Sequence, residues 1–127
     1  MAGKSKRPRA SALVVSRGKV LLVRHRREKN FSLPGGGIER GETALEAAVR
    51  EVREETRLRA YFAKRLFDSD VDGQMARHRV TLIKANGRVR LQHREIAEYL
   101  WWDGRSKIQA NGHIRSIVKS SGVFKHD

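Results

Sequence analysis

"GGIERGETALEAAVREVREETRL", residues 36–58, joins a glycine-rich start to the one strongly helical segment of the chain. Thr43, followed by Glu46 three residues later, forms a capping box, which predicts a helix from Thr43 to about Thr56. Three glutamates would share one face of this helix: Glu51, Glu54 and Glu55. Like charges at these spacings repel one another, so a helix that needed only stability would avoid the arrangement.

The remaining positions of the helix divide between an apolar and a solvated side. The apolar stripe that should pack on a sheet is Leu45, Ala48, Val49 and Val52. The solvated side is expected to hold Glu46, Arg50 and Arg53. Two interpretations of the glutamates follow: a solvated face paired with the arginines, or a site for a hard divalent cation such as Mg²⁺ or Mn²⁺. The glycines just upstream favour the second, because they let backbone approach whatever the carboxylates hold.

The rest of the sequence predicts one α+β domain with a mixed sheet, covering residues 10–127 behind a flexible basic tail at residues 1–9. "ASALVVS" and "KVLLVRH" are typical of two strands of a hairpin with Gly18 at the turn. Further strands are expected in "LRAYFAKRLFDS", "RHRVTLIKA", "GRVRL" and "EYLWW". A second helix is expected near the C-terminal end, with Ile114, Ile117 and Val118 on one face and Gly122 as its stop.

Composition limits the class of protein. The 127 residues carry 28 Lys and Arg against 14 Asp and Glu, a net charge of +14. Such a field attracts polyanions, although a generally basic proteome would explain it equally well. The chain has no cysteine, which excludes disulfides and thiolate metal sites and fits a cytoplasmic location. No apolar run reaches the roughly 18 residues of a membrane span, so no membrane partner is expected.

Residues 36–58 resemble the Nudix box, G-x5-E-x7-R-E-U-x-E-E-x-G-U, where U is a bulky aliphatic residue. The matching positions are Gly36, Glu42, Arg50, Glu51, Val52, Glu54, Glu55 and Leu58. Arg57 stands where the family has a glycine that leaves the helix in a left-handed turn. The resemblance implies the Nudix fold, an α/β/α sandwich with a mixed β-sheet and a loop-helix-loop platform.

The resemblance also implies site residues. The expected ligands of Mg²⁺ or Mn²⁺ are Glu51, Glu54, Glu55 and the carbonyl of Gly35. Arg50 is expected to hold the carboxylates by bidentate pairing, and Glu42 to support them. Candidates for the general base are Glu51, Glu54 and, outside the box, Glu95, with Glu98 a weaker choice. The substrate-binding residues are expected to be Arg24, Arg26, Arg27, Gly36 and Gly37.

The implied activity is metal-dependent hydrolysis of a phosphoanhydride in a nucleoside diphosphate linked to another group X, with a nucleoside triphosphate as the favoured substrate. Alternatives are a more highly charged polyphosphate (dinucleoside polyphosphate, inositol pyrophosphate or RNA 5′ end) and a non-catalytic, basic RNA-binding module on the same scaffold. The expected partner is therefore a small nucleotide or polyphosphate, with RNA as the alternative, and the expected state is a monomer or a homodimer.

Overall fold

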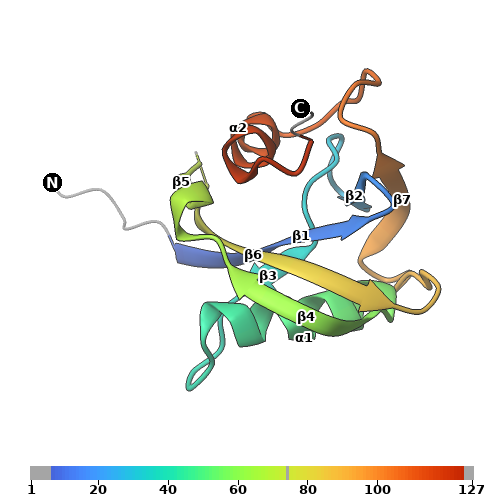
Figure 1. The fold of residues 1–127 in the computed structure, drawn as a ribbon. Coiled ribbons are helices and arrows are strands. Elements are labelled where there is room, and N and C mark those ends of the chain that lie inside the picture. Colours follow the sequence, from blue (N-terminus) through green and yellow to red (C-terminus); the bar gives the residue numbers. More distant parts are fainter. Residues whose placement is uncertain (1–6, 74, 125–127) are drawn as a thin grey trace, which may run out of the picture.

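The computed structural model describes residues 7–73 and 75–124, which form a single sheet with a helix on each face (Figure 1). The longer elements are β1 (Arg7–Ser16), β2 (Lys19–His25), α1 (Ala44–Thr56), β4 (Arg59–Arg65), β6 (Ala76–Asn86), β7 (Ile96–Trp102) and α2 (Gly112–Ser121). The short ones are β3 (Gly35–Gly37), the 3₁₀ turn η1 (Phe67–Ser69) and β5 (Val71–Asp72).

The sheet is mixed, as the sequence predicts. Its strand order is β4-β6-β1-β2-β7, with β3 paired to β1 and β5 paired to β6. β1 runs parallel to β6, and the remaining pairs are antiparallel. β1 is therefore the central strand, and it contacts β3 at its N-terminal end and β2 at its C-terminal end.

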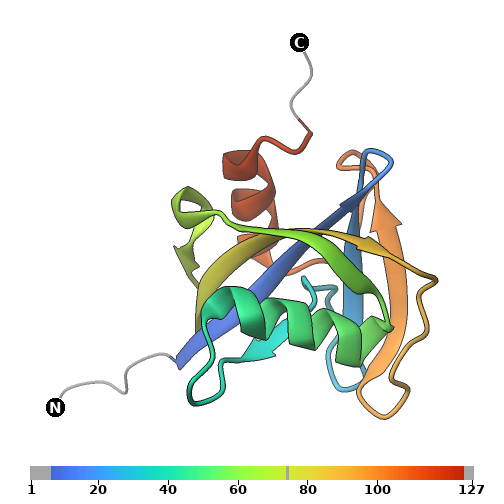
Figure 2. The same ribbon diagram turned by 60° about the horizontal axis from the view of Figure 1, so that its bottom comes forward.

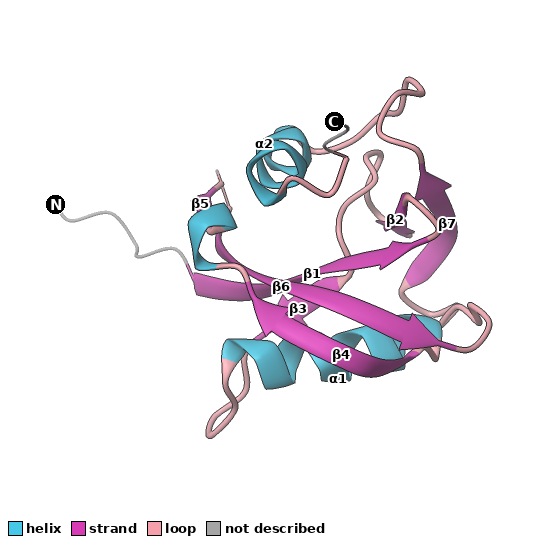
Figure 3. Ribbon diagram, viewed as in Figure 1, coloured by secondary structure: helices cyan, strands magenta, loops and turns pink. Residues whose placement is uncertain are grey.

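Alternation along β1 builds two cores on opposite faces of the sheet. Ala10, Ala12 and Val14 lie in the core beneath α1, whereas Leu13 lies in the core beneath α2. Figure 3 shows the two helices on opposite sides of the strands, and Figure 2 shows α1 running across the sheet from its own side. The expected α/β/α sandwich is confirmed.

The predicted hairpin and C-terminal helix are also present. Arg17 and Gly18 both have positive φ, 51° and 75°, as a two-residue type I′ turn requires. β1 and β2 pair only next to this turn, at Val15 with Val20 and at Ser16 with Lys19. α2 ends at Gly122, which has a left-handed φ of 73°.

Two sequence expectations need correction. "GRVRL" is not a strand, because the backbone here caps the end of α1 instead: Arg90 N donates to Thr56 O, and N of the following Gln92 donates to Glu55 O. Residues 7–9 are not part of a flexible tail, because they belong to β1, where Arg9 lies opposite Gly37 and His78. Residues 1–6 of that tail lie outside the described residues.

Neither helix in the described part of the chain is both long enough and apolar enough to span a bilayer.

Candidate active site

β3 brings backbone unusually close to its neighbours on both sides. Gly35 has φ +153°, and a Cβ on it would lie 1.9 Å from the carbonyl oxygen of Ala10. A Cβ on Gly36 would lie 2.2 Å from Oε2 of Glu51. Both positions therefore require glycine, one to pair with β1 and the other to admit a carboxylate from α1.

Both ends of α1 are fixed locally. The Thr43 side chain accepts a hydrogen bond from Glu46 N at 3.1 Å, and the Glu46 side chain accepts one from Thr43 N at 2.9 Å. This confirms the capping box. At the other end Arg57 adopts the left-handed conformation, with φ 66°, and its N–H donates to Arg53 O at 2.9 Å. Arginine therefore keeps the backbone conformation for which a glycine is usual.

The three glutamates of α1 lie at different depths. Glu55 is 2% exposed, Glu51 is partly buried and Glu54 is exposed. Gly35 N donates to Oε1 of Glu55 at 3.2 Å. Burial, reinforced by the neighbouring charge of Glu51, raises the pKa of Glu55 to about 8, and burial also raises the pKa of Glu51. Such carboxylates would be stabilised by a cation.

Arg50 supplies one cation to this cluster. Its guanidinium contacts Glu42 at 2.6 Å, Glu54 at 2.9 Å and Glu51 at 3.3 Å. It also donates to Gly37 O at 3.0 Å, so it ties α1 to β3. The hydrogen bond from Arg50 lowers the pKa of Glu42, and the same bond raises the pKa of Arg50 above its ordinary value.

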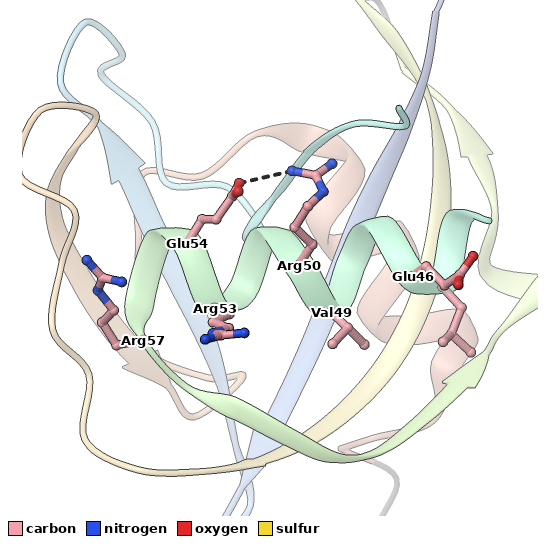
Figure 4. Close-up of a pocket in the computed structure, with 7 residues that line it drawn as sticks. Glu46, Val49, Arg50, Arg53, Glu54 and Arg57 are labelled. Carbon is pink, nitrogen blue, oxygen red and sulfur yellow. Dashed lines mark hydrogen bonds and ion pairs between the residues drawn. The ribbon is translucent and has the colours of Figure 1, made fainter. Parts of the chain in front are cut away.

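The expected division of α1 into faces is wrong in two places. Arg50 is not separate from the glutamates as expected: Figure 4 shows it bonded to Glu54, whereas Arg53 projects away from this pair. The buried apolar residues of α1 are Ala47, Ala48 and Val52. Leu45 and Val49 are only partly buried, and they line a surface hollow of about 580 Å³ together with Arg53 and Arg57.

The basic residues at the end of β2 and in the loop after it line a separate hollow of about 550 Å³ and are not part of the glutamate cluster. Arg24, Arg26 and Arg27 all line it. Arg24 is paired with Glu98 at 2.6 Å, and Arg26 donates to the carbonyl of His93. Glu95 is exposed in the turn before β7, and its charge adds to the raised pKa of Glu55.

Sequence reasoning missed Arg9. Its guanidinium donates to Leu33 O at 3.3 Å, and its charge partly opposes the burial that raises the pKa of Glu51 and of Glu55. The sequence did contain a signal, because Arg9 is spaced to share one face of a strand with Ser11 and Leu13. Assigning residues 1–9 to a tail concealed it.

The donor set fits a hard divalent cation in its chemistry. Carboxylate oxygens and a backbone carbonyl are the ligands that Mg²⁺ and Mn²⁺ prefer, and buried Glu55 receives a hydrogen bond only from a backbone N–H among the described residues. Within that part of the chain no three carboxylate or imidazole groups already surround a common point. The reason is visible in the contacts: Arg50 occupies the space between Glu51 and Glu54, while Glu55 turns towards Gly35.

These features define a class: an α/β/α protein whose acidic helix packs its carboxylates against a glycine strand. The family model described as "NUDIX domain" matches residues 5–113, and the chain belongs to that family.

Comparisons with individual proteins agree with this membership. The chain is 40% identical over 57 residues to the "Probable DHNTP pyrophosphohydrolase" of Lactococcus lactis subsp. cremoris, a match that covers 45% of this chain and 32% of that protein. It thus spans about a third of the length of this curated relative. A solved "nudix hydrolase family member from Chromobacterium violaceum" superposes with a TM-score of 0.81 and 26% identity, covering 99% of this chain and 83% of that one. The MutT NUDIX hydrolase from Burkholderia pseudomallei superposes with a TM-score of 0.76 and 20% identity, covering 92% of this chain and 98% of that one. At this identity the match supports the fold alone.

Proposed function

We propose that this protein is a divalent-metal-dependent hydrolase of phosphoanhydride bonds in nucleotide-linked substrates, with a nucleoside triphosphate as the favoured substrate. The observation that carries the proposal is the contact between the Glu51 carboxylate and Gly36, with Glu54 and Glu55 on the same helix and Arg50 bridging the acidic groups. Family membership and the naming of the Lactococcus relative as a pyrophosphohydrolase support it.

Four groups would hold the metal: the carboxylates of Glu51, Glu54 and Glu55 and the carbonyl of Gly35. A bound divalent cation supplies charge neutralisation at the phosphate oxygens, which is the main requirement of phosphoryl transfer.

The chain's own residues do the positioning. Arg50 fixes the carboxylates of Glu42, Glu51 and Glu54 through bonds that reach α1, the loop before it and β3. Gly36 and Gly37 are proposed to bind the phosphate chain through their backbone, and a Cβ on Gly37 would meet no protein atom within 4 Å. The general base, which takes the proton of the attacking water, is proposed to be Glu51, Glu54 or Glu95.

A more highly charged polyphosphate is a second candidate substrate, because the loop after β2 gathers positive charge beside the site. Arg24, Arg26, Arg27 and Lys29 line its hollow together with only two carboxylates. Charge complementarity would favour an extended chain of phosphates at this loop.

A substrate screen tests the proposal. Release of phosphate and pyrophosphate is measured with Mg²⁺, with Mn²⁺ and with excess chelator, over nucleoside triphosphates, dinucleoside polyphosphates, inositol pyrophosphates and 5′-triphosphate RNA. We expect hydrolysis that requires metal, with ¹⁸O from labelled water in one phosphate product. Turnover that persists in chelator, or no turnover with either metal on any of these substrates, contradicts the proposal.

A further inference from the structure

The strand β4 forms one edge of the sheet, because it is the last strand in the order β4-β6-β1-β2-β7 (Figure 3). Large hydrophobic side chains are exposed at five described positions, and three of these positions lie on β4 or in the turn that follows it. Tyr61 is 64% exposed, Phe62 is 42% exposed and Phe67 is 72% exposed. A group of exposed apolar side chains, unlike a single one, indicates an interaction surface.

A β-bulge exposes two consecutive rings of this group. Ala60 pairs with Ala85 and Phe62 pairs with Lys84, so Tyr61 is an extra residue between the two pairs. In a regular strand, Tyr61 and Phe62 would point to opposite faces of the sheet. The bulge interrupts this alternation, and both rings are exposed.

Cations lie against two of the rings. Nζ of Lys84, an exposed residue of β6, is 5.5 Å from the centroid of the Phe62 ring. Cζ of Arg65 is 4.4 Å from the centroid of the Phe67 ring, and Asp70 holds this guanidinium at 2.7 Å. Both ring contacts are within the range of a cation–π interaction. The edge therefore presents positive charge and aromatic rings together.

The two strands at this edge carry cations and no carboxylate. Their cations are Arg59, Lys64, Arg65, Arg77, Arg79 and Lys84. Three of them are exposed and make no ion pair with a described residue: Arg59, Lys64 and Lys84. Together with the three exposed rings, these three cations form what we call the β4 edge surface. Its charge is complementary to a polyanion.

The chemistry of this surface decides between possible occupants. Exposed cations alone would protect an open strand edge from aggregation, but that role does not require exposed rings. A second copy of the chain fits poorly, because pairing two β4 strands would join edges that each carry three cations and no carboxylate. A lipid surface also fits poorly, since Phe67 could enter the acyl chains only together with the guanidinium of Arg65.

We propose that the β4 edge surface is a docking site for single-stranded RNA, whose bases stack on the exposed rings while its phosphates contact the exposed cations. Unpaired bases stack on aromatic side chains in this way with little dependence on sequence. A duplex keeps its bases stacked inside and offers phosphates alone. The site is separate from the proposed hydrolytic centre, because its residues line neither of the hollows described above and do not belong to the glutamate cluster.

Binding is measured by fluorescence anisotropy with an oligouridylate of about twelve nucleotides, labelled at its 3′ end. Its 5′ end is a hydroxyl and the buffer contains chelator, so the result does not depend on hydrolysis of a phosphoanhydride. Replacing both Phe62 and Phe67 by Ala should raise the dissociation constant by about tenfold or more. Tyr99→Ala removes an exposed ring from β7, the opposite edge strand, and should leave the dissociation constant nearly unchanged. Circular dichroism checks that the variants fold.

Salt dependence separates the contribution of the cations from that of the rings. Each phosphate contact of a single strand contributes about 0.7 to the slope of log affinity against log salt concentration. Lys84→Gln should therefore reduce the slope by about 0.7. Lys107→Gln removes the same charge at an exposed position outside the surface and should leave the slope unchanged. The double Phe→Ala variant should bind more weakly at every salt concentration with the wild-type slope.

Duplex RNA of the same length and vesicles of phosphatidylserine and phosphatidylcholine complete the comparison. We expect the duplex to bind more weakly than the single strand and to be insensitive to the double Phe→Ala substitution. The proposal is wrong if the duplex and the single strand bind alike, or if the double variant binds the single strand as tightly as Tyr99→Ala does. Loss of vesicle binding in the double variant, with RNA binding retained, would assign the surface to a membrane instead.

Discussion

Gly36 has no side chain, and the carboxylate of Glu51 occupies the space where one would be. An added Cβ would lie 2.2 Å from Oε2 and 2.6 Å from Cδ of Glu51, so the glutamate would have to move. A Cβ on the next residue, Gly37, would meet nothing within 4 Å. The two adjacent glycines thus form a matched pair.

We expect Gly36→Ala to reduce turnover by about a hundredfold, the effect of displacing an active-site group by about an ångström. Gly37→Ala should remain within severalfold of wild type. Initial rates on the best substrate of the screen measure the effect, with circular dichroism to show that both variants fold. Equal rates for the two variants would mean that the position of Glu51 is not critical.

Arg57 is held in a left-handed conformation that costs a non-glycine residue about 1 kcal/mol. Arg57→Gly should therefore raise the free energy of unfolding by about 1 kcal/mol. Arg53→Gly, one turn earlier within the regular part of α1, should lower it by a similar amount. Denaturant midpoints measure both changes, and a loss of stability in Arg57→Gly would show that the arginine contributes contacts that outweigh the strain.

At the scale of the element, α1 depends on the capping box at its start. Thr43→Ala should cost about 1 kcal/mol of unfolding free energy, because Glu46 N loses its acceptor. Thr43→Ser retains a hydroxyl and should cost much less. Urea titrations of the two variants measure the difference. If Ala and Ser are equally stable at this position, the capping bond does not contribute.

The sequence predicts α1 well because its signals are local. The capping box of Thr43 and Glu46 lies within one turn of the residues that it fixes, whereas the division of the helix into faces also depends on the sheet beneath it. Residues 87–91 show the opposite case. Their alternation is typical of a strand, but the backbone of Arg90 bonds to Thr56, more than thirty positions earlier. Nothing near this segment in the sequence indicates that partner.

The same distinction holds for the sites. Glu51, Glu54 and Glu55 come from one helix, so their proximity could be predicted from spacing alone. His78 and His113 come from β6 and α2, and only the topology of the whole sheet stacks them. Arg50 is intermediate: its position on α1 could be predicted, whereas its bond to the carbonyl of Gly37 depends on β3.

At the scale of the whole molecule, the buried histidine couples stability to pH. The pKa of His78 is lowered to about 4 from an ordinary value of 6.5, so between these values the unfolded chain binds the proton more tightly. Its contribution to stability is complete above pH 6.5 and is lost as pH falls towards 4. Glu55, whose pKa is raised to about 8, acts in the opposite sense over an overlapping range, so only a variant isolates the histidine.

His78→Asn should therefore lose less stability than the wild type between pH 7 and pH 4.5. His93→Asn, at an exposed position, should keep the wild-type dependence. Denaturant midpoints across this range provide the comparison. Parallel curves for His78→Asn and wild type would show that the imidazole titrates alike in the folded and unfolded states.

The central claim is that the glutamates of α1 hold a catalytic divalent metal, and a pair of substitutions on one helix tests it most directly. Glu54→Gln removes a proposed ligand and relieves charge repulsion, so the fold should be retained. Glu46→Gln makes the same chemical change in the first turn of α1, away from the proposed metal ligands. Glutamine can replace glutamate as the partner in a capping box. The measurement is turnover as a function of Mg²⁺ concentration for the two variants and the wild type.

We expect Glu54→Gln to lose turnover by orders of magnitude, and Glu46→Gln to follow the wild-type curve. A folded Glu54→Gln protein with near-normal, Mg²⁺-dependent turnover would contradict the account.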